Sequence, residues 1–93
     1  GDAVVIRRDL TIVNRLGLHA RATAKLVQLL STFRCQATLE ARGREVNAKS
    51  IMGVMMLAAG PGSTVVLRVD GEDAEAAADA AAALFERRFD EDA

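Results

Sequence analysis

The apolar residues of this 93-residue chain change their spacing several times, and these changes constrain the fold more than any other feature. Apolar residues at every second position indicate half-buried strands, whereas a spacing of three or four indicates amphipathic helices. A chain of this length has room for one core. Because the chain has three Phe and no Trp or Tyr, that core must be largely aliphatic. We therefore expect residues 1–93 to form one domain.

The segments with alternating apolar residues predict four strands, at residues 10–13, 35–40, 44–47 and 64–70. The inward-facing side chains are expected to be Leu10, Ile12, Cys35, Ala37, Leu39, Val65, Leu67 and Val69. Arg42 and Gly43 supply a tight turn, so the second and third strands should form a hairpin.

Three helices are predicted between and after these strands. The first begins at Ala20 and ends near Ser31 and Thr32, and the second covers 51–59 between Ser50 as N-cap and the sequence Gly60-Pro61-Gly62. The third begins at Glu72-Asp73. Its inward-facing residues should be Ala77, Ala81, Leu84 and Phe85. This order of elements indicates an α+β domain in which helices pack on one face of a four-stranded, largely antiparallel sheet.

The only histidine, His19, lies where the first helix should begin. The N–H groups of a first helical turn lack internal partners and carry about half a positive charge, so they bind anions. A phosphoryl group on the imidazole would therefore find donors ready. From the residues alone, the alternative that His19 only caps the helix stays open.

A second unusual segment follows Ser50, where three methionines occur and no charged residue appears before Arg68. A short apolar helix at the edge of a small domain should expose part of its surface. Exposed Ile and Met side chains make an adaptable docking surface. A fully buried helix is the alternative.

The two segments Gly17-Leu18-His19-Ala20-Arg21 and Lys49-Ser50-Ile51-Met52-Gly53-Val54-Met55 resemble signatures of one family. They are similar to the active-site and regulatory-serine motifs of the histidine-containing phosphocarrier proteins (HPr) of the bacterial phosphoenolpyruvate-dependent phosphotransferase system (PTS). The resemblance implies an open-faced β-sandwich of order βαββαβα, with a four-stranded antiparallel sheet and three helices on one face. The chain departs from the family at Ala22, where many members have proline. Alanine is also a good helix former, so little functional loss is expected.

The resemblance also implies roles for the site residues. Nδ1 of His19 would accept a phosphoryl group from phosphorylated enzyme I and pass it to an enzyme IIA component, so the chain would be a carrier and not an enzyme. Arg21 and the backbone N–H groups of Ala20 and Arg21 would hold the phosphoryl oxygens. No cofactor or metal is expected. The alternative function is a purely regulatory HPr-like paralogue that acts by binding other proteins.

Ser50 corresponds to the regulatory phosphorylation site of the family, which is used by an ATP-dependent HPr kinase/phosphorylase in bacteria that possess that enzyme. A phosphate there would add about −1.5 to −2 charge at a helix N-terminus beside the docking surface. The alternative is that Ser50 serves only as a helix cap.

The net charge of −1 hides an asymmetry. Residues 1–68 hold ten Lys and Arg against four Asp and Glu (+6), and residues 69–93 hold two against nine (−7). We expect an acidic partner to dock on the basic part. The expected docking residues are Arg15, Arg21, Lys25 and Lys49 around an apolar centre of Ile51, Met52 and Met55. The acidic run at residues 90–92 is expected to be a solvated end.

Several other classes of protein are disfavoured. RNA-binding sheets need exposed aromatic residues on strands, whereas Phe33, Phe85 and Phe89 fall in or beside predicted helices, so we expect no nucleic-acid binding. The apolar stretch at 51–60 has about half the ~20 residues of a membrane span. Because residues 1–8 show neither an apolar h-region nor a small-residue cleavage site, no secretory signal is expected. The single Cys35 cannot form an internal disulfide and is expected to be a small core residue. We therefore expect a cytoplasmic monomer, with a small binding module as the competing class.

Overall fold

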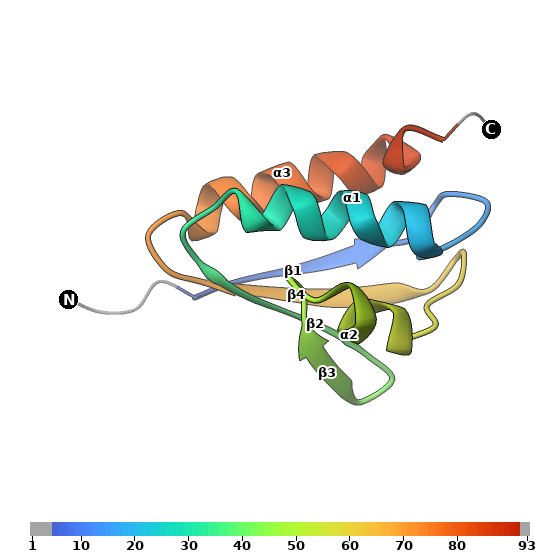
Figure 1. Ribbon diagram of the computed structural model, residues 1–93, viewed down its shortest axis with the longest axis horizontal. Coiled ribbons are helices and arrows are strands. Elements are labelled where there is room, and N and C mark those ends of the chain that lie inside the picture. The colour runs from blue at the N-terminus through green and yellow to red at the C-terminus, as the bar shows by residue number, and fades with distance from the viewer. Residues whose placement is uncertain (1–4, 92–93) are drawn as a thin grey trace.

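The computed structural model describes residues 5–91, which form a four-stranded antiparallel sheet with helices along one face (Figure 1). The strands are β1 (Val5–Thr11), β2 (Gln36–Ala41), β3 (Arg44–Asn47) and β4 (Thr64–Asp70), in the spatial order β1-β4-β2-β3. The helices are α1 (Ala20–Ser31), α2 (Ile51–Met56) and α3 (Ala74–Glu86), followed by the short turn η1 (Arg88–Asp90). This arrangement confirms the predicted α+β open-faced sandwich.

The sheet has one apolar face and one charged face, because successive side chains of a strand point to opposite sides. On the apolar face, Leu67 of β4 lies opposite Leu39 of β2, and neither is accessible to solvent. On the other face, the Arg68 guanidinium donates hydrogen bonds to Glu40 at 2.7 Å and Glu45 at 3.4 Å. The bond to Glu40 raises the pKa of Arg68. Only the apolar face is therefore suited to carry the helices.

The helices α1 and α3 lie side by side on the apolar face, and α2 lies below the N-terminal half of α1 (Figure 1). The buried side chains of the two long helices include Ala22, Leu26, Leu30, Ala77, Ala81, Leu84 and Phe85, all predicted by the helical spacing. The same spacing predicted Leu29 and Phe33 on the inward stripe of the first helix, but these two are only partly buried. The rings of Phe85 and Phe89 pack with their centroids 4.8 Å apart. Because α1 packs beside α3, the C-terminal end of α3 lies next to the start of α1 (Figure 1).

The first strand begins five residues before the predicted position, at Val5, and ends at Thr11. The three charged residues 7–9 concealed it from an analysis of apolar spacing. They are accommodated because β1 is an edge strand, where charged side chains reach solvent. Arg7 pairs with Asp9 at 3.1 Å, and Arg8 reaches Asp79 of α3 at 3.3 Å.

The second helix ends at Met56, three residues before the predicted end. Beyond it Ala58 has φ +49°, a left-handed conformation that turns the chain out of the helix. The carbonyls in this region are used elsewhere, since the Arg42 guanidinium donates to that of Leu57 and the Leu18 N–H to that of Ala59. At the other end, Ser50 is the N-cap as predicted, and its Oγ accepts a hydrogen bond of 3.1 Å from the Gly53 N–H.

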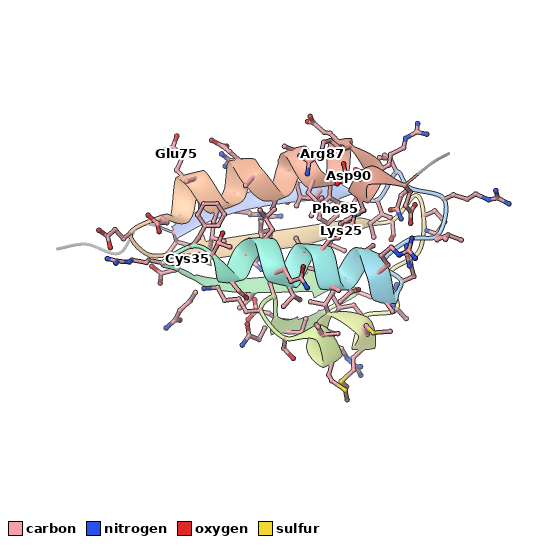
Figure 2. The ribbon with its side chains drawn as sticks, turned by 45° about the horizontal axis from the view of Figure 1, so that its top comes forward. Lys25, Cys35, Glu75, Phe85, Arg87 and Asp90 are labelled. Atoms are coloured by element: carbon pink, nitrogen blue, oxygen red, sulfur yellow. The ribbon has the colours of Figure 1, made fainter. Side chains whose placement is uncertain are left out.

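Cys35 was predicted to be a core residue. It packs against the core but is only half-buried, so this prediction is only partly correct. It follows α1, at the opposite end of that helix from His19 (Figure 2). Within residues 5–91, no helix is long and apolar enough to cross a membrane. The same range contains no group of three or more His, Cys, Asp or Glu side chains that could hold a metal ion.

Candidate functional site at the start of the first helix

The loop that precedes α1 holds His19 at the start of this helix. Gly17 has φ +69°, and a Cβ at this position would lie 2.8 Å from the carbonyl oxygen of Ala59. The Gly17 carbonyl accepts a hydrogen bond of 2.8 Å from Nδ2 of the buried Asn14, and the Leu18 N–H donates to Ala59 at 3.0 Å. Since these bonds fix the backbone immediately before the histidine, the position of His19 is set by the fold and not by its own side chain.

His19 is the N-cap residue of α1, with an extended backbone (φ −75°, ψ 179°). Its carbonyl accepts the Thr23 N–H at 2.8 Å, but its imidazole makes no capping hydrogen bond. Within residues 5–91, no protein acceptor binds the N–H groups of Ala20 and Arg21. These groups are therefore free donors beside the ring, as an anion site at a helix N-terminus requires.

The end of the described chain returns to this histidine. After α3 the backbone turns through η1, and Glu91 Oε1 forms a hydrogen bond with His19 Nε2. The Glu91 side chain is 14% exposed and that of His19 is 28% exposed. The prediction that the acidic end is only solvated is therefore wrong for Glu91, which is separated from His19 by 72 positions in the sequence. Asp92 lies outside the described residues.

The turn that carries Glu91 is anchored between α1 and α3. Phe89 is 1% exposed, and its carbonyl accepts a hydrogen bond of 3.0 Å from Lys25 Nζ. Asp90 pairs with Lys25 at 3.4 Å and with Arg87 at 3.0 Å. The hydrogen bond from Arg87 is the main reason why the pKa of Asp90 is lowered. Figure 2 shows Lys25, Phe85, Arg87 and Asp90 together where the end of α3 lies beside α1.

The carboxyl group of Glu91 is subject to opposing effects on its pKa. Partial burial raises the pKa, but the hydrogen bond with His19 and the nearby positive charge of Arg21 lower it, and the net result is a lowered pKa. Glu91 is therefore an ionised carboxylate at neutral pH, facing the ring nitrogen Nε2.

A surface cleft of about 690 Å³ brings several predicted site residues together. It is lined by Arg15, Leu16, His19, Ala20, Arg21, Lys25, Phe89, Asp90 and Glu91. Arg15 and Arg21 are exposed, whereas Lys25 is partly occupied in holding the C-terminal turn. Leu16, 63% exposed, was not predicted as a site residue. The cleft thus combines the imidazole, free backbone donors and three basic side chains.

The second predicted segment exposes apolar side chains, as its composition indicates. Ile51, Met52, Met55 and Met56, here called the α2 patch, are between 44% and 76% exposed, and within α2 only Val54 is buried. Met56 was missing from the prediction. Lys49 was predicted at the rim of this surface. Its ammonium group donates to the carbonyls of Phe33 and Cys35, so it ties the segment before α2 to the loop between α1 and β2.

Comparison with known proteins places this site in context. The family profile described as "PTS HPr component phosphorylation site" matches residues 6–87. The chain is 58% identical over 88 residues to a phosphocarrier protein HPr of Xylella fastidiosa, covering 95% of this chain and 99% of the relative. Among solved structures, HPr-C-His from Thermoanaerobacter tengcongensis superposes with a TM-score of 0.91 at 41% identity, covering 95% and 99% of the two chains. A structure titled as an HPr dimer from the same organism has a TM-score of 0.76 at 44% identity, covering 88% and 94%.

Proposed function

Because this chain belongs to the HPr family of PTS phosphocarrier proteins, we propose that His19 is the residue on which it carries the phosphoryl group. The observation that supports this most is the position of the only histidine, at the N-cap of α1 beside the free N–H groups of Ala20 and Arg21. A phosphocarrier is the substrate of one enzyme and the donor to another, and is not itself an enzyme.

The chemistry follows from this geometry. Nδ1 of His19 attacks the phosphorus of phosphorylated enzyme I, and the bond between phosphorus and the donor atom breaks, its electron pair leaving with enzyme I. The oxygens of the transferred group receive hydrogen bonds from the N–H groups of Ala20 and Arg21, and the Arg21 guanidinium neutralises their charge. The reverse chemistry hands the group to an enzyme IIA component. The imidazole of His19 therefore supplies the nucleophile, and the N-terminus of α1 stabilises the negative charge of the phosphoryl oxygens.

The docking surface that we propose combines the cleft and the α2 patch. Arg15 and Arg21 supply most of the positive charge, and Lys25, which also pairs with Asp90, supplies less. Ile51, Met52 and Met55 supply the apolar centre, as in a transient interface with an acidic partner. Met56 extends this centre. The engaged ammonium group of Lys49 favours a structural contribution over direct contact with the partner. We keep a cytoplasmic monomer as the working form, because a carrier must present one site to successive partners.

Ser50 is proposed as a regulatory phosphorylation site where an HPr kinase/phosphorylase is present. The side chain is half-buried, and its Oγ already accepts the Gly53 N–H at the start of α2. A phosphate at this position adds negative charge at a helix N-terminus, which is favourable for the helix. It also places that charge beside the α2 patch, so we expect weaker transfer from enzyme I without unfolding.

The test is the intact mass of the protein after incubation with enzyme I and phosphoenolpyruvate, with His19→Ala as the control. We expect the unaltered chain to gain one acid-labile phosphoryl group and the variant to gain none. If the unaltered chain gains nothing while enzyme I phosphorylates another carrier, the carrier role is wrong. The alternative, a regulatory paralogue acting through protein binding, would then be favoured.

A further inference from the structure

We propose that Glu91 is a positioning residue for phosphoryl transfer, because its carboxylate holds the proton of His19 on Nε2 and leaves the lone pair of Nδ1 free to attack. This inference rests on the proposed role of His19. It assigns a function to a residue that lies 72 positions away in the sequence and beyond the matched residues 6–87.

The direction of the hydrogen bond between Glu91 and His19 determines which ring nitrogen carries the proton. The contact joins His19 Nε2 to Glu91 Oε1, and an ionised carboxylate can only accept hydrogen bonds. Nε2 must therefore carry the proton. In the neutral ring this leaves Nδ1 without a proton, so Nδ1 is the nucleophilic atom. The contact also restricts rotation of the imidazole, whose own cap interaction is absent.

The fold holds Glu91 in place beside His19. Arg88, Phe89 and Asp90 have φ values of +57°, +55° and +60°, which L-amino acids rarely adopt. Three consecutive residues keep this conformation only where surrounding contacts determine it. Those contacts are the buried ring of Phe89, the bond from Lys25 to the Phe89 carbonyl and the pair between Arg87 and Asp90.

The charge of the His19 ring changes during the reaction. When Nδ1 forms its bond to phosphorus, the ring still keeps the Nε2 proton, so it becomes positively charged. The negative carboxylate of Glu91 is already hydrogen-bonded to that proton and stabilises the new charge without moving. A carboxylate that orients a histidine and stabilises its cationic form plays the same part in hydrolytic triads. Passing the phosphoryl group on returns the ring to its neutral form.

Glu91 contributes a hydrogen-bond acceptor for Nε2 and a negative charge. Substituting Glu91 by Gln or by Ala separates these two contributions. Glu91→Gln keeps an oxygen that can accept the Nε2 proton but removes the negative charge, whereas Glu91→Ala removes both. Glu86→Ala is the matched control, because Glu86 is an exposed acid on the nearby end of α3. The variant Glu91→Ala retains Phe89 and Lys25, which anchor the turn.

The experiment combines ¹⁵N NMR of the His19 ring, recorded near pH 8 without any partner, with the initial rate of phosphoryl transfer from enzyme I. We expect Glu91→Ala to lose the dominance of the Nε2–H form and to transfer about tenfold more slowly, the factor for one charged hydrogen bond that is partly exposed to solvent. Glu91→Gln should keep the ring spectrum but transfer more slowly than the unaltered chain. Glu86→Ala should match the unaltered chain in both measurements.

Two results would overturn the proposal: a ring spectrum in Glu91→Ala identical to that of the unaltered chain, or a transfer rate that the substitution leaves unchanged. Thermal unfolding followed by circular dichroism checks that the variants are folded. Failure of the proposed function is distinguishable, since a chain that never gains a phosphoryl group still gives a ring spectrum that reports whether Glu91 fixes the proton.

Discussion

At the scale of single residues, the candidate site depends on several residues that hold His19 and its loop in place. Gly17 allows the loop to approach the Ala59 carbonyl, Asn14 holds the loop, and Glu91 faces the imidazole. The position of His19 at a helix start could be predicted from the sequence, because the first turn of an amphipathic helix is a local signal. Sequence analysis could not predict Glu91, because no local pattern connects two positions 72 residues apart.

Position 17 requires a residue that adopts a positive φ and that leaves space for the Ala59 carbonyl. Comparison with Gly62 separates these two requirements. Both glycines have positive φ, but a Cβ at Gly62 meets nothing within 4 Å, whereas at Gly17 it meets the Ala59 carbonyl at 2.8 Å. Gly62→Ala should lower the free energy of unfolding by about 1 kcal/mol, the cost of the left-handed conformation. Gly17→Ala should lower it by about 1–3 kcal/mol more, because of the clash. Urea unfolding measures both, and equal losses would contradict the assigned role of the close approach.

The lowered pKa of Glu91 predicts how stability depends on pH. A carboxyl group whose pKa is lower in the folded chain than its ordinary value of 4.5 stabilises the fold above that value. The stabilisation is lost as the pH falls from there through the lowered pKa. We therefore expect the unaltered chain to be more stable than Glu91→Gln at pH 7, with the difference shrinking below pH 4.5. Urea unfolding at several pH values tests this, with Glu86→Gln as control, and a difference that grows in acid would refute it.

At the scale of elements, the regular apolar spacing predicted α1, the hairpin and β4 with nearly correct bounds. The errors occurred where other forces decide the boundary. Charged residues hid the start of β1, since an edge strand does not need alternating apolar residues. The end of α2 is set by Ala58 and by acceptors used by Arg42 and Leu18, contacts that come from distant parts of the chain.

The cap of α2 offers a test that separates stability from transfer. Ser50→Ala removes the acceptor for the Gly53 N–H and should cost about 1 kcal/mol of unfolding free energy. Ser50→Asp keeps a capping oxygen, so its stability should stay near that of the unaltered chain, but its charge beside the α2 patch should slow phosphoryl transfer from enzyme I. Unfolding and transfer assays on both variants check this. Transfer to Ser50→Asp at the unaltered rate would show that charge here does not affect docking.

At the scale of the whole molecule, the chain separates its charges in sequence but combines them in space. The basic part carries Arg15, Arg21 and Lys25, and the acidic part brings Asp90 and Glu91 to the same cleft. The sequence predicted the asymmetry, but only the packing of α3 beside α1 shows that the two parts meet (Figure 1). The free charge offered to a partner is therefore smaller than the composition indicates, since Lys25 and Lys49 are already engaged.

Docking through the remaining basic residues predicts sensitivity to salt. The rate of transfer from enzyme I should fall several-fold between about 0.05 and 0.5 M salt, because screening shortens the range of attraction between exposed charges. Arg15→Gln should reduce both the rate at low salt and its salt dependence. Arg34→Gln is the matched control, since Arg34 is 83% exposed but lies beyond the opposite end of α1. A rate independent of salt would contradict electrostatic docking.

The position of η1 also has a practical consequence for handling the protein. Val5 begins β1 at one end of the molecule, whereas the turn that leads to Glu91 lies at the other end, against the cleft (Figure 1). A fluorescent label or sensor-chip linkage attached near Glu91 would lie beside His19 and the cleft. The same attachment near Val5 would leave the cleft clear. Binding and transfer measurements should therefore be made with the protein attached near Val5.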